Sequence, residues 1–438
     1  MSERIPFSWP IHLDAYSKDA PFLAWVDSGV IHTYSYAELL KNSSSLALKA
    51  HSRPPAEPIS LPLTDRTPKK AILASSYLLA GVPFSISKAT EAGKNLSGSH
   101  SGGRSPLDPV MITLETSGTT GKPKTVEIVA SQIDHAVRNL PTPFHTAAGE
   151  YWGHALPLHH VGGVSILGRA LSTGGGVAFA KDTSVEAIQE LLTYVPLKGI
   201  SLVATQLQRL LKHSDSIERL STQDAILLGG GPLPLEVAEQ ALAHELPIYQ
   251  SYGMTETFAM IAAHRLSDTP AEPQCIGKPF GDTEIMLQNG TLHLRGTQIG
   301  GTSSEAASSG QPSSDSWFDT GDLGRMDQQG RWIIEARRDD LILSGGNNIS
   351  PLRLEQAIAQ HPTIEAVIVL GVDDTEWGQR VVAIVEPNPT TDESTLQAAL
   401  HPVALDTWIK KQEALHSYER PKEWIILPEG KTIPRTAI

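Results

Sequence analysis

A regular alternation of strand and helix patterns constrains the fold of this chain more than any other feature of its sequence. Short apolar, β-prone runs predict strands at 59–63, 82–86, 110–114, 125–129, 199–203, 224–228 and 248–250. Apolar residues at helical spacing predict helices at 34–50, 71–80, 132–140, 164–171, 185–192, 206–211 and 235–243. Ser35 and Ser131 are suited to be N-caps of two of these helices. Strands separated by helices pair in parallel, so the sequence predicts an α/β fold built from βαβ-type sheets.

The pattern changes in the last third of the chain. β-prone pieces at 284–287 and 291–295 flank Asn289-Gly290, which is a strong hairpin signal, and a Gly/Ser/Ala-rich insert follows at 300–316. The remaining residues follow a β-α-β-β-α-β pattern, with helices at 352–360 and around 395–415 and strands at 366–371, 381–386 and 423–427. We therefore expect a large N-terminal domain, residues 1–338, with an additional β-rich part. A small α+β C-terminal domain, residues 339–438, is expected to follow it.

Composition and charge restrict the classes of function. With 438 residues, of which 40% are hydrophobic and 19% charged, the chain suits a globular protein of two or three packed units. A net charge of −13 argues against nucleic acid as the main partner. The single cysteine, Cys275, excludes internal disulfides and a cysteine-based zinc site, and fits a cytoplasmic protein. The N-terminus lacks the apolar region of a signal peptide, and polar residues interrupt the apolar stretch 71–86, so no membrane insertion is expected.

The stretch between the strands expected at 110–114 and 125–129 has a composition that favours phosphate binding. Its residues are Thr116, Ser117, Gly118, Thr119, Thr120, Gly121, Lys122, Pro123 and Lys124. Glycine allows backbone N–H groups to turn towards an anion, while hydroxyl and ammonium groups add donors and positive charge. It is not a Walker loop, because Pro123 follows Lys122 where Ser or Thr is required. The alternative is an ordinary polar hairpin loop.

Two further features carry chemistry. Adjacent His159 and His160 precede an apolar helix that contains Arg169. Zinc is an alternative for the histidines, but neighbouring residues point in different directions, and metal-binding pairs on helices are usually four residues apart. An arginine in an apolar helix usually pairs with a carboxylate, either of the protein or of a ligand. It could also simply tie two helices together.

The order of the chemically distinctive segments indicates a family. The phosphate-binding stretch precedes segments at 157–163, 229–234, 252–257, 320–322 and 337–346. Over residues 30–438 this order resembles the adenylate-forming superfamily of acyl-CoA synthetases, luciferases and adenylation domains. Within it, Leu156-Pro157-Leu158-His159-His160-Val161-Gly162-Gly163, with Arg169 after it, is most similar to the o-succinylbenzoate–CoA ligases of menaquinone synthesis. The segments 227–234 and 344–349 support the same similarity.

This resemblance implies an AMP-forming ligase that uses ATP, Mg²⁺ and CoA. Phosphate binding falls to Thr116, Ser117, Gly118, Thr119, Thr120, Gly121, Lys122 and Lys124. Nucleotide binding falls to Gly230, Gly231, Tyr252, Gly253, Asp322 and Arg337, with Tyr252 stacking on adenine and the last two contacting the ribose. The implied catalytic residues are Thr255, at the α-phosphate, Glu256, which also holds Mg²⁺, and His160.

The same resemblance implies the sites for the acid and for CoA. His160, Arg169 and Ser251 are expected to bind the acid. O-succinylbenzoate has a second carboxylate, for which Arg169 would be the partner, since an unpaired buried charge is costly. Asp339 is expected to be the hinge on which the C-terminal domain rotates, and Gly345 and Gly346 to border the path of CoA. A ligase for another aromatic or fatty acid is the alternative.

The last residues depart from the family pattern. The family motif Ile-Pro-Arg-Thr-x-x-Gly-Lys ends in a lysine that acts in adenylation, whereas this chain has Ile433-Pro434-Arg435-Thr436-Ala437-Ile438. We expect the sequence to be truncated before that lysine. If the natural chain ended at Ile438, a weakly active or non-catalytic adenylate-binding protein would be the alternative. A homodimer is the general expectation for a soluble oligomer.

Overall fold

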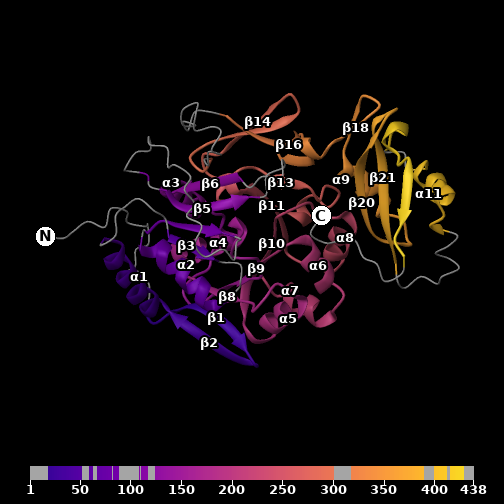
Figure 1. Cartoon of the computed structure of the whole chain (residues 1–438). Helices are drawn as coiled ribbons and strands as arrows, with labels where there is room; N and C mark the ends of the chain where they lie inside the picture. The colour runs from indigo at the N-terminus through magenta and orange to yellow at the C-terminus, as the bar shows by residue number, and fades with distance from the viewer. Residues whose placement is uncertain are drawn as a thin grey trace. The chain divides into compact units, whose positions relative to one another are not determined.

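The computed structural model describes residues 18–51, 59–62, 67–80, 82–87, 108, 110–116, 124–299, 317–388, 399–411 and 415–428 (Figure 1). Contacts within the chain divide it into two compact units. Unit 1 consists of Met1–Leu233, Val237–Met286 and His293–Phe318, and unit 2 of Pro234–Glu236, Leu287–Leu292 and Asp319–Ile438. The domain boundary at 338/339 stays a prediction.

The larger sheet of unit 1 has eight strands in the order β12-β11-β10-β9-β7-β8-β1-β2. Its strands are β1 (Pro21–Asp27), β2 (Val30–Ser35), β7 (Tyr151–His154), β8 (Gly176–Phe179), β9 (Leu197–Leu202), β10 (Ala225–Leu228), β11 (Ile248–Met254) and β12 (Ala259–Arg265). The pairs from β11 to β1 are parallel, and the outermost strands β12 and β2 are antiparallel to their neighbours. The predicted parallel sheet is confirmed. The β1–β2 hairpin was not predicted, although Ser28-Gly29 at its turn, with φ of 50° and 76°, is a turn dipeptide.

The second sheet of unit 1 has four strands in the order β3-β4-β5-β6. These are β3 (Ile59–Pro62), β4 (Phe84–Ser87), β5 (Val110–Thr116) and β6 (Lys124–Val129). β3, β4 and β5 are parallel, whereas β6 returns antiparallel to β5. Thr116 pairs with Lys124 at the turn end of this hairpin, where residues 117–123 connect the two strands.

Helices cover both sheets of unit 1. They are α1 (Tyr36–His51), α2 (Pro68–Ala80), α3 (Ala130–Arg138), α4 (Val161–Thr173), α5 (Val185–Tyr194), α6 (Ala204–Leu210), α7 (Ser214–Ser221) and α8 (Leu235–Ala243). One core joins the second sheet to α2, α3, α4 and one part of the larger sheet. Another core joins α5 to α8 with β9, β10 and β11. α4 is nearly all apolar because it lies buried in the first of these cores.

Unit 2 contains its own core. The antiparallel pair β16 (Phe318–Met326) and β17 (Trp332–Arg337) precedes a sheet in the order β19-β18-β21-β20, with β22 beside β21. The strands of this sheet are β18 (Ile342–Ser344), β19 (Asn347–Ile349), β20 (Ile364–Asp374), β21 (Gly378–Pro387) and β22 (Glu423–Ile426). Helices α9 (Pro351–Ile358) and α11 (Pro402–Ile409) pack on it. The expected α+β pattern is confirmed.

Strands β13 (Cys275–Gly277), β14 (Glu284–Gln288) and β15 (Thr291–Arg295) form the additional β-rich part. Asn289 and Gly290 between β14 and β15 have φ of 53° and 81°, as the hairpin signal predicted. The Gly/Ser/Ala-rich insert expected at 300–316 lies outside the described residues.

One helix start differs from its prediction. Ser35 caps α1 through its hydroxyl, which accepts from Glu38 N at 3.3 Å, as expected. Ser131, however, lies inside α3, and its hydroxyl donates to Asp108 Oδ2 at 2.6 Å. The N-cap of α3 is Val129, whose N–H donates to the side chain of Gln132 at 3.0 Å. The prediction of Ser131 as N-cap is wrong because glutamine at the third helical position satisfies the same end of the helix.

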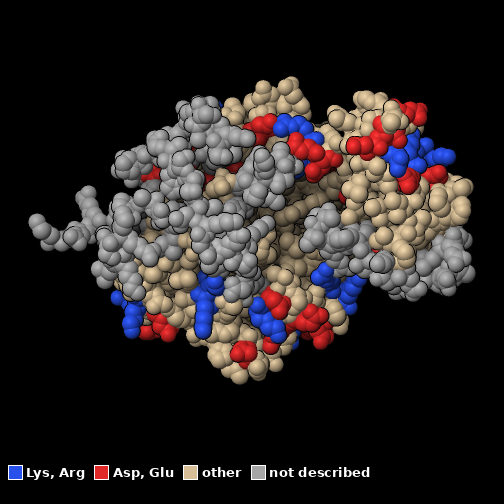
Figure 2. Space-filling model, viewed as in Figure 1, with Lys and Arg blue, Asp and Glu red and all other residues tan. Residues whose placement is uncertain are grey.

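Within the described part of the chain, none of the helices has the length and apolarity needed to cross a bilayer. On the face of the molecule in view in Figure 2, acidic and basic side chains lie close to one another. The net charge of −13 is therefore not seen as a purely acidic surface on this face.

Candidate active site

The ends of β10 and β11 bring several predicted residues to one edge of the larger sheet. Gly229, Gly230 and Gly231 follow β10, and Ser251 to Met254 form the end of the neighbouring β11. Ser251 Oγ donates to Leu228 O at 2.7 Å, which joins the two strand ends. Ligands of open α/β sheets bind at the carboxyl ends of their parallel strands. This edge is therefore the candidate nucleotide site of unit 1.

Local geometry explains why glycines occupy this edge. Gly230 has φ of 82°, and a Cβ at Gly231 would have nothing within 4 Å, so that position is open. A Cβ at Gly253 would lie 1.9 Å from Ala259 O, so only glycine fits there. Tyr252, which precedes Gly253 in β11, is half-buried. An open glycine edge beside an aromatic side chain fits a flat base.

The short 3₁₀ turn η3 (Thr255–Thr257) follows directly and carries Thr255 and Glu256, both half-buried. Two residues in the left-handed region come next, Phe258 with φ of 46° and Ala259 with φ of 74°. Such conformations are uncommon for residues other than glycine and are concentrated at functional sites. Glu256 has no cationic partner among the described residues. A half-buried carboxylate without a cation beside a hydroxyl fits a magnesium site, because Mg²⁺ prefers oxygen ligands.

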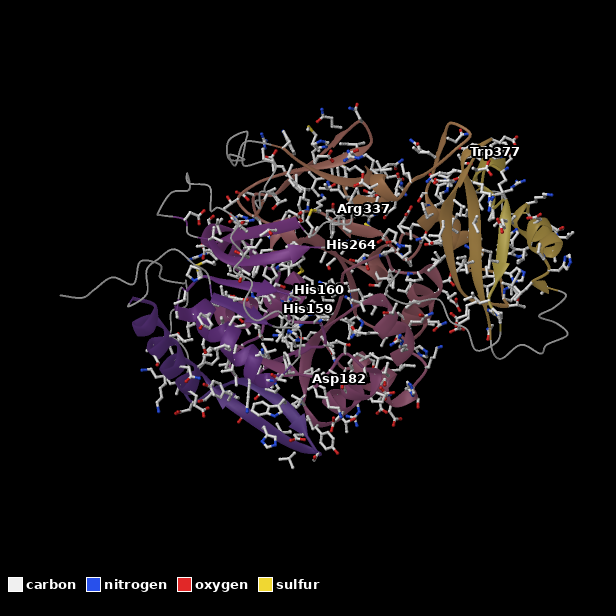
Figure 3. All side chains as sticks on the ribbon, in the orientation of Figure 1. His159, His160, Asp182, His264, Arg337 and Trp377 are labelled. Atoms are coloured by element: carbon white, nitrogen blue, oxygen red, sulfur yellow. The ribbon has the colours of Figure 1, made fainter. Side chains whose placement is uncertain are left out.

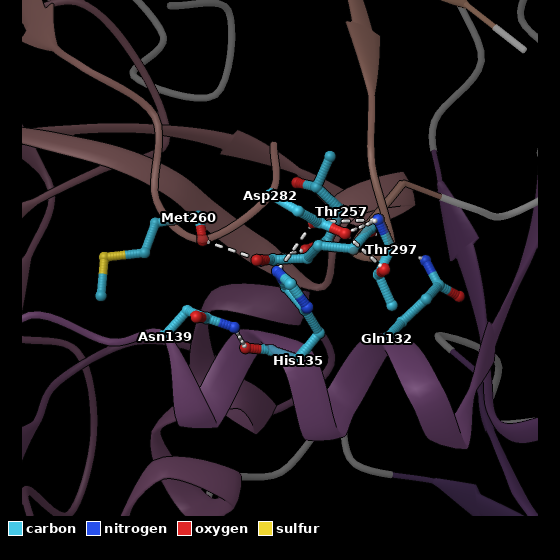
Figure 4. A network of polar contacts seen from close by, with 8 residues as sticks. Gln132, His135, Asn139, Thr257, Met260, Asp282 and Thr297 are labelled. Carbon is cyan, nitrogen blue, oxygen red and sulfur yellow. Dashed lines mark hydrogen bonds and ion pairs between the residues drawn. The ribbon is translucent and has the colours of Figure 1, made fainter. Parts of the chain in front are cut away.

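Two buried glutamines that were not predicted from the sequence, Gln132 and Gln298, hold this turn; Figure 4 labels Gln132, Thr257 and Met260. Gln132 Nε2 donates to Glu256 O at 3.0 Å and to Gln298 O at 3.2 Å. Gln298 Nε2 donates to Thr257 O at 2.8 Å and to Met260 O at 2.9 Å. A glutamine at the third position of α3 was a possible signal for Gln132. The sequence around Gln298 contains no comparable signal.

Arg169 lies in α4 and is buried, with 7% of its surface exposed. Its Nη2 donates to Ser201 Oγ at 3.3 Å, and its guanidinium lies 4.7 Å from the centre of the Trp152 ring. Its Nη1 is buried and has no hydrogen-bond partner among the residues that the structure describes. Burial lowers the pKa of the guanidinium to about 9, which leaves it protonated at neutral pH. These contacts are with strands β7 and β9 and not with a second helix, which disfavours the helix-tie interpretation.

His159 and His160 lie next to each other, with ring centres 4.4 Å apart (Figure 3). His160 is exposed at the N-cap of α4, and its carbonyl accepts from Val164 N at 3.2 Å. Groups of three or more metal-ligating side chains are absent from the described residues. Because Arg169 is buried further along the helix, a role of His160 in the acid site stays a prediction.

The predicted phosphate-binding residues 117–123 lie outside the described part of the chain. The backbones of Thr116 and Lys124 are paired at the ends of β5 and β6, so a hairpin connection between two strands is confirmed as the setting of the loop. Its grip on a phosphate stays a prediction.

Unit 2 carries the predicted ribose residues. Asp322 and Arg337 are cross-strand partners in β16 and β17, and Arg337 Nη1 donates to Asp322 Oδ1 at 2.9 Å. Asp322 is 7% exposed, so its carboxylate is held in place by the strand and by this arginine. Asp339 lies exposed in the 3₁₀ turn η6 (Arg338–Asp340), directly after β17. A turn between two strands is a suitable place for a hinge.

The predicted CoA residues Gly345 and Gly346 form the turn between β18 and β19. Their φ values of 56° and 79° lie in the left-handed region, which favours glycine. A Cβ at Gly345 would lie 2.9 Å from the ring of Trp377, whereas a Cβ at Gly346 would have nothing within 4 Å. Gly346 is thus open on its outer side.

Similarity to known proteins agrees with this arrangement. Residues 63–299 match the AMP-binding enzyme family, and residues 353–438 match the AMP-binding enzyme C-terminal domain. The 2-succinylbenzoate–CoA ligase of Listeria monocytogenes serovar 1/2a is 33% identical over 327 residues, 74% of this chain and 66% of that protein. The ligase of serotype 4b is 30% identical over 410 residues, 92% of this chain and 84% of that protein. The chain thus spans about two thirds of the first relative and more of the second.

Solved structures share the fold. The o-succinylbenzoate CoA synthetase (MenE) from Bacillus subtilis, in complex with the acyl-adenylate intermediate OSB-AMP, has a TM-score of 0.77 at 24% identity and covers 96% of this chain and 94% of its own. The same enzyme with ATP and magnesium ion has a TM-score of 0.72 at 23% identity, with 93% of both chains covered. The family match extends over more than half of the 438 residues. The chain belongs to the AMP-binding enzyme family.

Proposed function

We propose that this protein is an ATP-dependent acid–CoA ligase that converts o-succinylbenzoate to o-succinylbenzoyl-CoA in menaquinone synthesis. Its family and the names of its curated relatives support the reaction class. The buried Arg169 guanidinium, with Nη1 unpaired, is the observation that supports the choice of acid. We propose a cytoplasmic location, and a homodimer as the oligomeric state.

In the first half-reaction, the carboxylate of the acid attacks the α-phosphorus of ATP, and pyrophosphate leaves. Thr255 donates to the α-phosphate, and Tyr252 stacks on adenine at the edge formed by Gly230 and Gly231. Glu256 would hold Mg²⁺, and the ion would supply positive charge opposite the phosphates. Loop residues 116–124 hold the leaving pyrophosphate with N–H, hydroxyl and ammonium donors. Asp322 accepts hydrogen bonds from the ribose, and Arg337 keeps that carboxylate oriented.

In the second half-reaction, the thiol of CoA attacks the acyl carbon, and AMP leaves with the electron pair of the broken bond. Gly346 leaves room for the pantetheine arm, because nothing lies within 4 Å of the position of its Cβ. Asp339 is the hinge on which the C-terminal domain rotates between the two half-reactions.

Arg169 sets the choice of acid through the carboxylate that does not react. Within the described part of the chain, this buried guanidinium contacts a hydroxyl and a ring face and has donors left, and a carboxylate accepts from two of them at once. The ring carboxylate of o-succinylbenzoate provides this partner, while its succinyl carboxylate is adenylated. A plain fatty or aryl acid leaves the buried cation without an anion, which costs binding energy.

Arg169→Leu tests the assignment with a matched pair of acids. The substrates are o-succinylbenzoate and 4-oxo-4-phenylbutanoate, which lacks only the ring carboxylate. We expect KM for o-succinylbenzoate to rise about a hundredfold and KM for the analogue to change less than about threefold. Arg219→Leu on α7, whose arginine is exposed, is the control for loss of a helical arginine.

The readouts are ATP–pyrophosphate exchange and formation of the thioester. Equal losses for both acids would refute the role of Arg169. Turnover of another aromatic or fatty acid, without thioester from o-succinylbenzoate, would refute the specific acid and leave the ligase class intact.

A further inference from the structure

We propose that Gln132 and Gln298 form an amide clamp, a pair of positioning residues that couples the magnesium ligand Glu256 to the strand leaving the phosphate loop. The inference rests on the proposed function, since it assigns Glu256 to Mg²⁺. It concerns residues that do not touch a substrate themselves. All of them lie in unit 1.

Gln298 holds the backbone on both sides of the strained turn. Its Nε2 donates to Thr257 O at 2.8 Å and to Met260 O at 2.9 Å, the carbonyls that flank Phe258 and Ala259. A left-handed conformation of a residue other than glycine persists only where surrounding contacts stabilise it. The Thr257 hydroxyl also bonds to the backbone of Met254 and Ala259, so loss of the Gln298 amide removes two of the contacts that hold η3 and the residues after it.

Gln132 connects this turn to β6. Its Oε1 accepts from Val129 N at 3.0 Å, at the end of β6, and its Nε2 donates to Glu256 O at 3.0 Å. The same Nε2 donates to the backbone carbonyl of Gln298 at 3.2 Å, which links the Gln132 side chain to the backbone of the second glutamine. β6 begins at Lys124, directly after residues 117–123. One side chain thus joins the strand that carries the phosphate loop to the backbone of the metal ligand.

The side-chain N–H groups of both glutamines donate to backbone carbonyls. Gln132 and Gln298 are each 1% exposed, so water does not replace a lost bond, and an unpaired buried carbonyl is costly. The clamp fixes the backbone of Glu256 and makes no contact with its carboxylate. Such an arrangement preorganises a ligand, because the backbone position is set before the metal binds.

A purely structural role is the competing explanation, and the chain contains its control. Gln206 at the third position of α6 makes the same contacts as Gln132. Its Oε1 accepts from Val203 N at 3.0 Å, and its Nε2 donates to Ala155 O at 3.0 Å and Thr183 O at 3.2 Å. It is also buried, with 5% of its surface exposed, yet it does not contact η3. Gln206→Leu therefore measures the cost of losing such an amide away from Glu256.

The test measures ATP binding to the full chain by titration calorimetry, with Mg²⁺ and with a chelator, and without any acid. The variants are Gln132→Leu, Gln298→Leu and the control Gln206→Leu. Gln298→Glu is a further variant that keeps the size and replaces the donor with an acceptor. We expect the clamp variants to lose about tenfold in affinity for ATP with Mg²⁺ and less than about twofold without it. Gln206→Leu should keep the wild-type increase in ATP affinity on addition of Mg²⁺. Its Tm should fall by an amount similar to that of the clamp variants.

Clamp variants that bind ATP with Mg²⁺ as tightly as Gln206→Leu does would overturn the proposal, as would equal losses with and without the metal. Because no acid is present, a wrong choice of acid does not affect these results. Absence of ATP binding by the wild type would overturn the proposed function and the clamp together.

Discussion

At the scale of single residues, Arg169 is poorly satisfied for a buried cation. Ser201 Oγ accepts hydrogen bonds from Trp152 Nε1 at 2.9 Å and from Arg169 Nη2 at 3.3 Å. The indole ring of Trp152 makes a cation–π contact with the guanidinium. A cation–π contact contributes about 2 kcal/mol or somewhat more in a desolvated site, whereas burying an unpaired charge costs several kcal/mol. The residue therefore costs stability in the free protein, as expected of a side chain that awaits a ligand anion.

Arg169→Met tests this cost. Methionine has a similar length, is apolar and adapts to irregular packing, so it removes the buried charge without leaving a large cavity. We expect the free energy of unfolding in urea to stay unchanged or to rise by up to about 2 kcal/mol. A loss of more than about 3 kcal/mol would instead identify Arg169 as a structural residue.

Ser201→Ala tests the support of the guanidinium. The variant leaves Trp152 Nε1 and Arg169 Nη2 without their shared acceptor. We expect KM for o-succinylbenzoate to rise about fivefold, a smaller effect than that of Arg169→Leu, because the charge remains and only its orientation is lost. Ser216→Ala is the control, since Ser216 is equally buried and accepts from Gln189 at 3.0 Å in another core. A KM effect of Ser216→Ala equal to that of Ser201→Ala would show that loss of any buried hydroxyl is sufficient.

At the scale of elements, α9 carries a half-buried carboxylate, that of Glu355, which makes unit 2 sensitive to pH. Desolvation raises the pKa of Glu355, and Asp340 raises it further, while the hydrogen bond from Val369 N at 2.8 Å opposes the shift. A raised pKa means that the protonated form is favoured by folding. The stability it contributes is present below the ordinary pKa of glutamate and is lost as pH rises through the raised value.

Glu355→Gln removes this dependence and keeps an oxygen for Val369 N. We expect the variant to have a higher Tm than the wild type at neutral pH, and the difference to vanish below the ordinary pKa of glutamate, about 4.3. Glu376→Gln, at an exposed position, should show no such pH-dependent difference. A constant difference in Tm between Glu355→Gln and the wild type at all pH values would contradict the assignment.

The elements themselves could be predicted because their signals are local. Periodic apolar residues located α4 and α8, and Asn289-Gly290 located the hairpin between β14 and β15. The clamp could not be predicted, because Gln298 acts on carbonyls of Thr257 and Met260 that lie far from it in the sequence. The left-handed conformation of Phe258 and Ala259 was also not predicted, because neither residue type favours it by itself.

At the scale of the whole molecule, strand order in the sheets determines which site residues lie close together more than the sequence motifs do. The segments at 229–234 and 252–257 follow adjacent parallel strands, so their proximity is a consequence of the topology. The pairing of Asp322 with Arg337 likewise follows from the register of β16 and β17. The sequence predicted the members of these groups through the family resemblance, whereas their geometry depended on strand order.

The domain boundary at 338/339 is open to a direct test. The core of unit 2 includes Ile342, Ile349 and Leu354, and its other buried members lie between Ile358 and Trp424. All of these residues follow the predicted boundary, although unit 2 as a whole begins earlier, with Asp319. Because a domain needs its own core to fold alone, we expect the segment 339–438 to be sufficient.

Three segments, 319–438, 339–438 and 353–438, separate the possibilities. We expect 319–438 and 339–438 to unfold cooperatively in thermal melts followed by circular dichroism, with the shorter one less stable because it lacks β17. The segment 353–438 lacks Ile342 and Ile349, which are 3% and 0% exposed, and should not fold cooperatively. Cooperative unfolding of 319–438 but not of 339–438 would move the boundary to the start of β16, and the hinge could then not be Asp339.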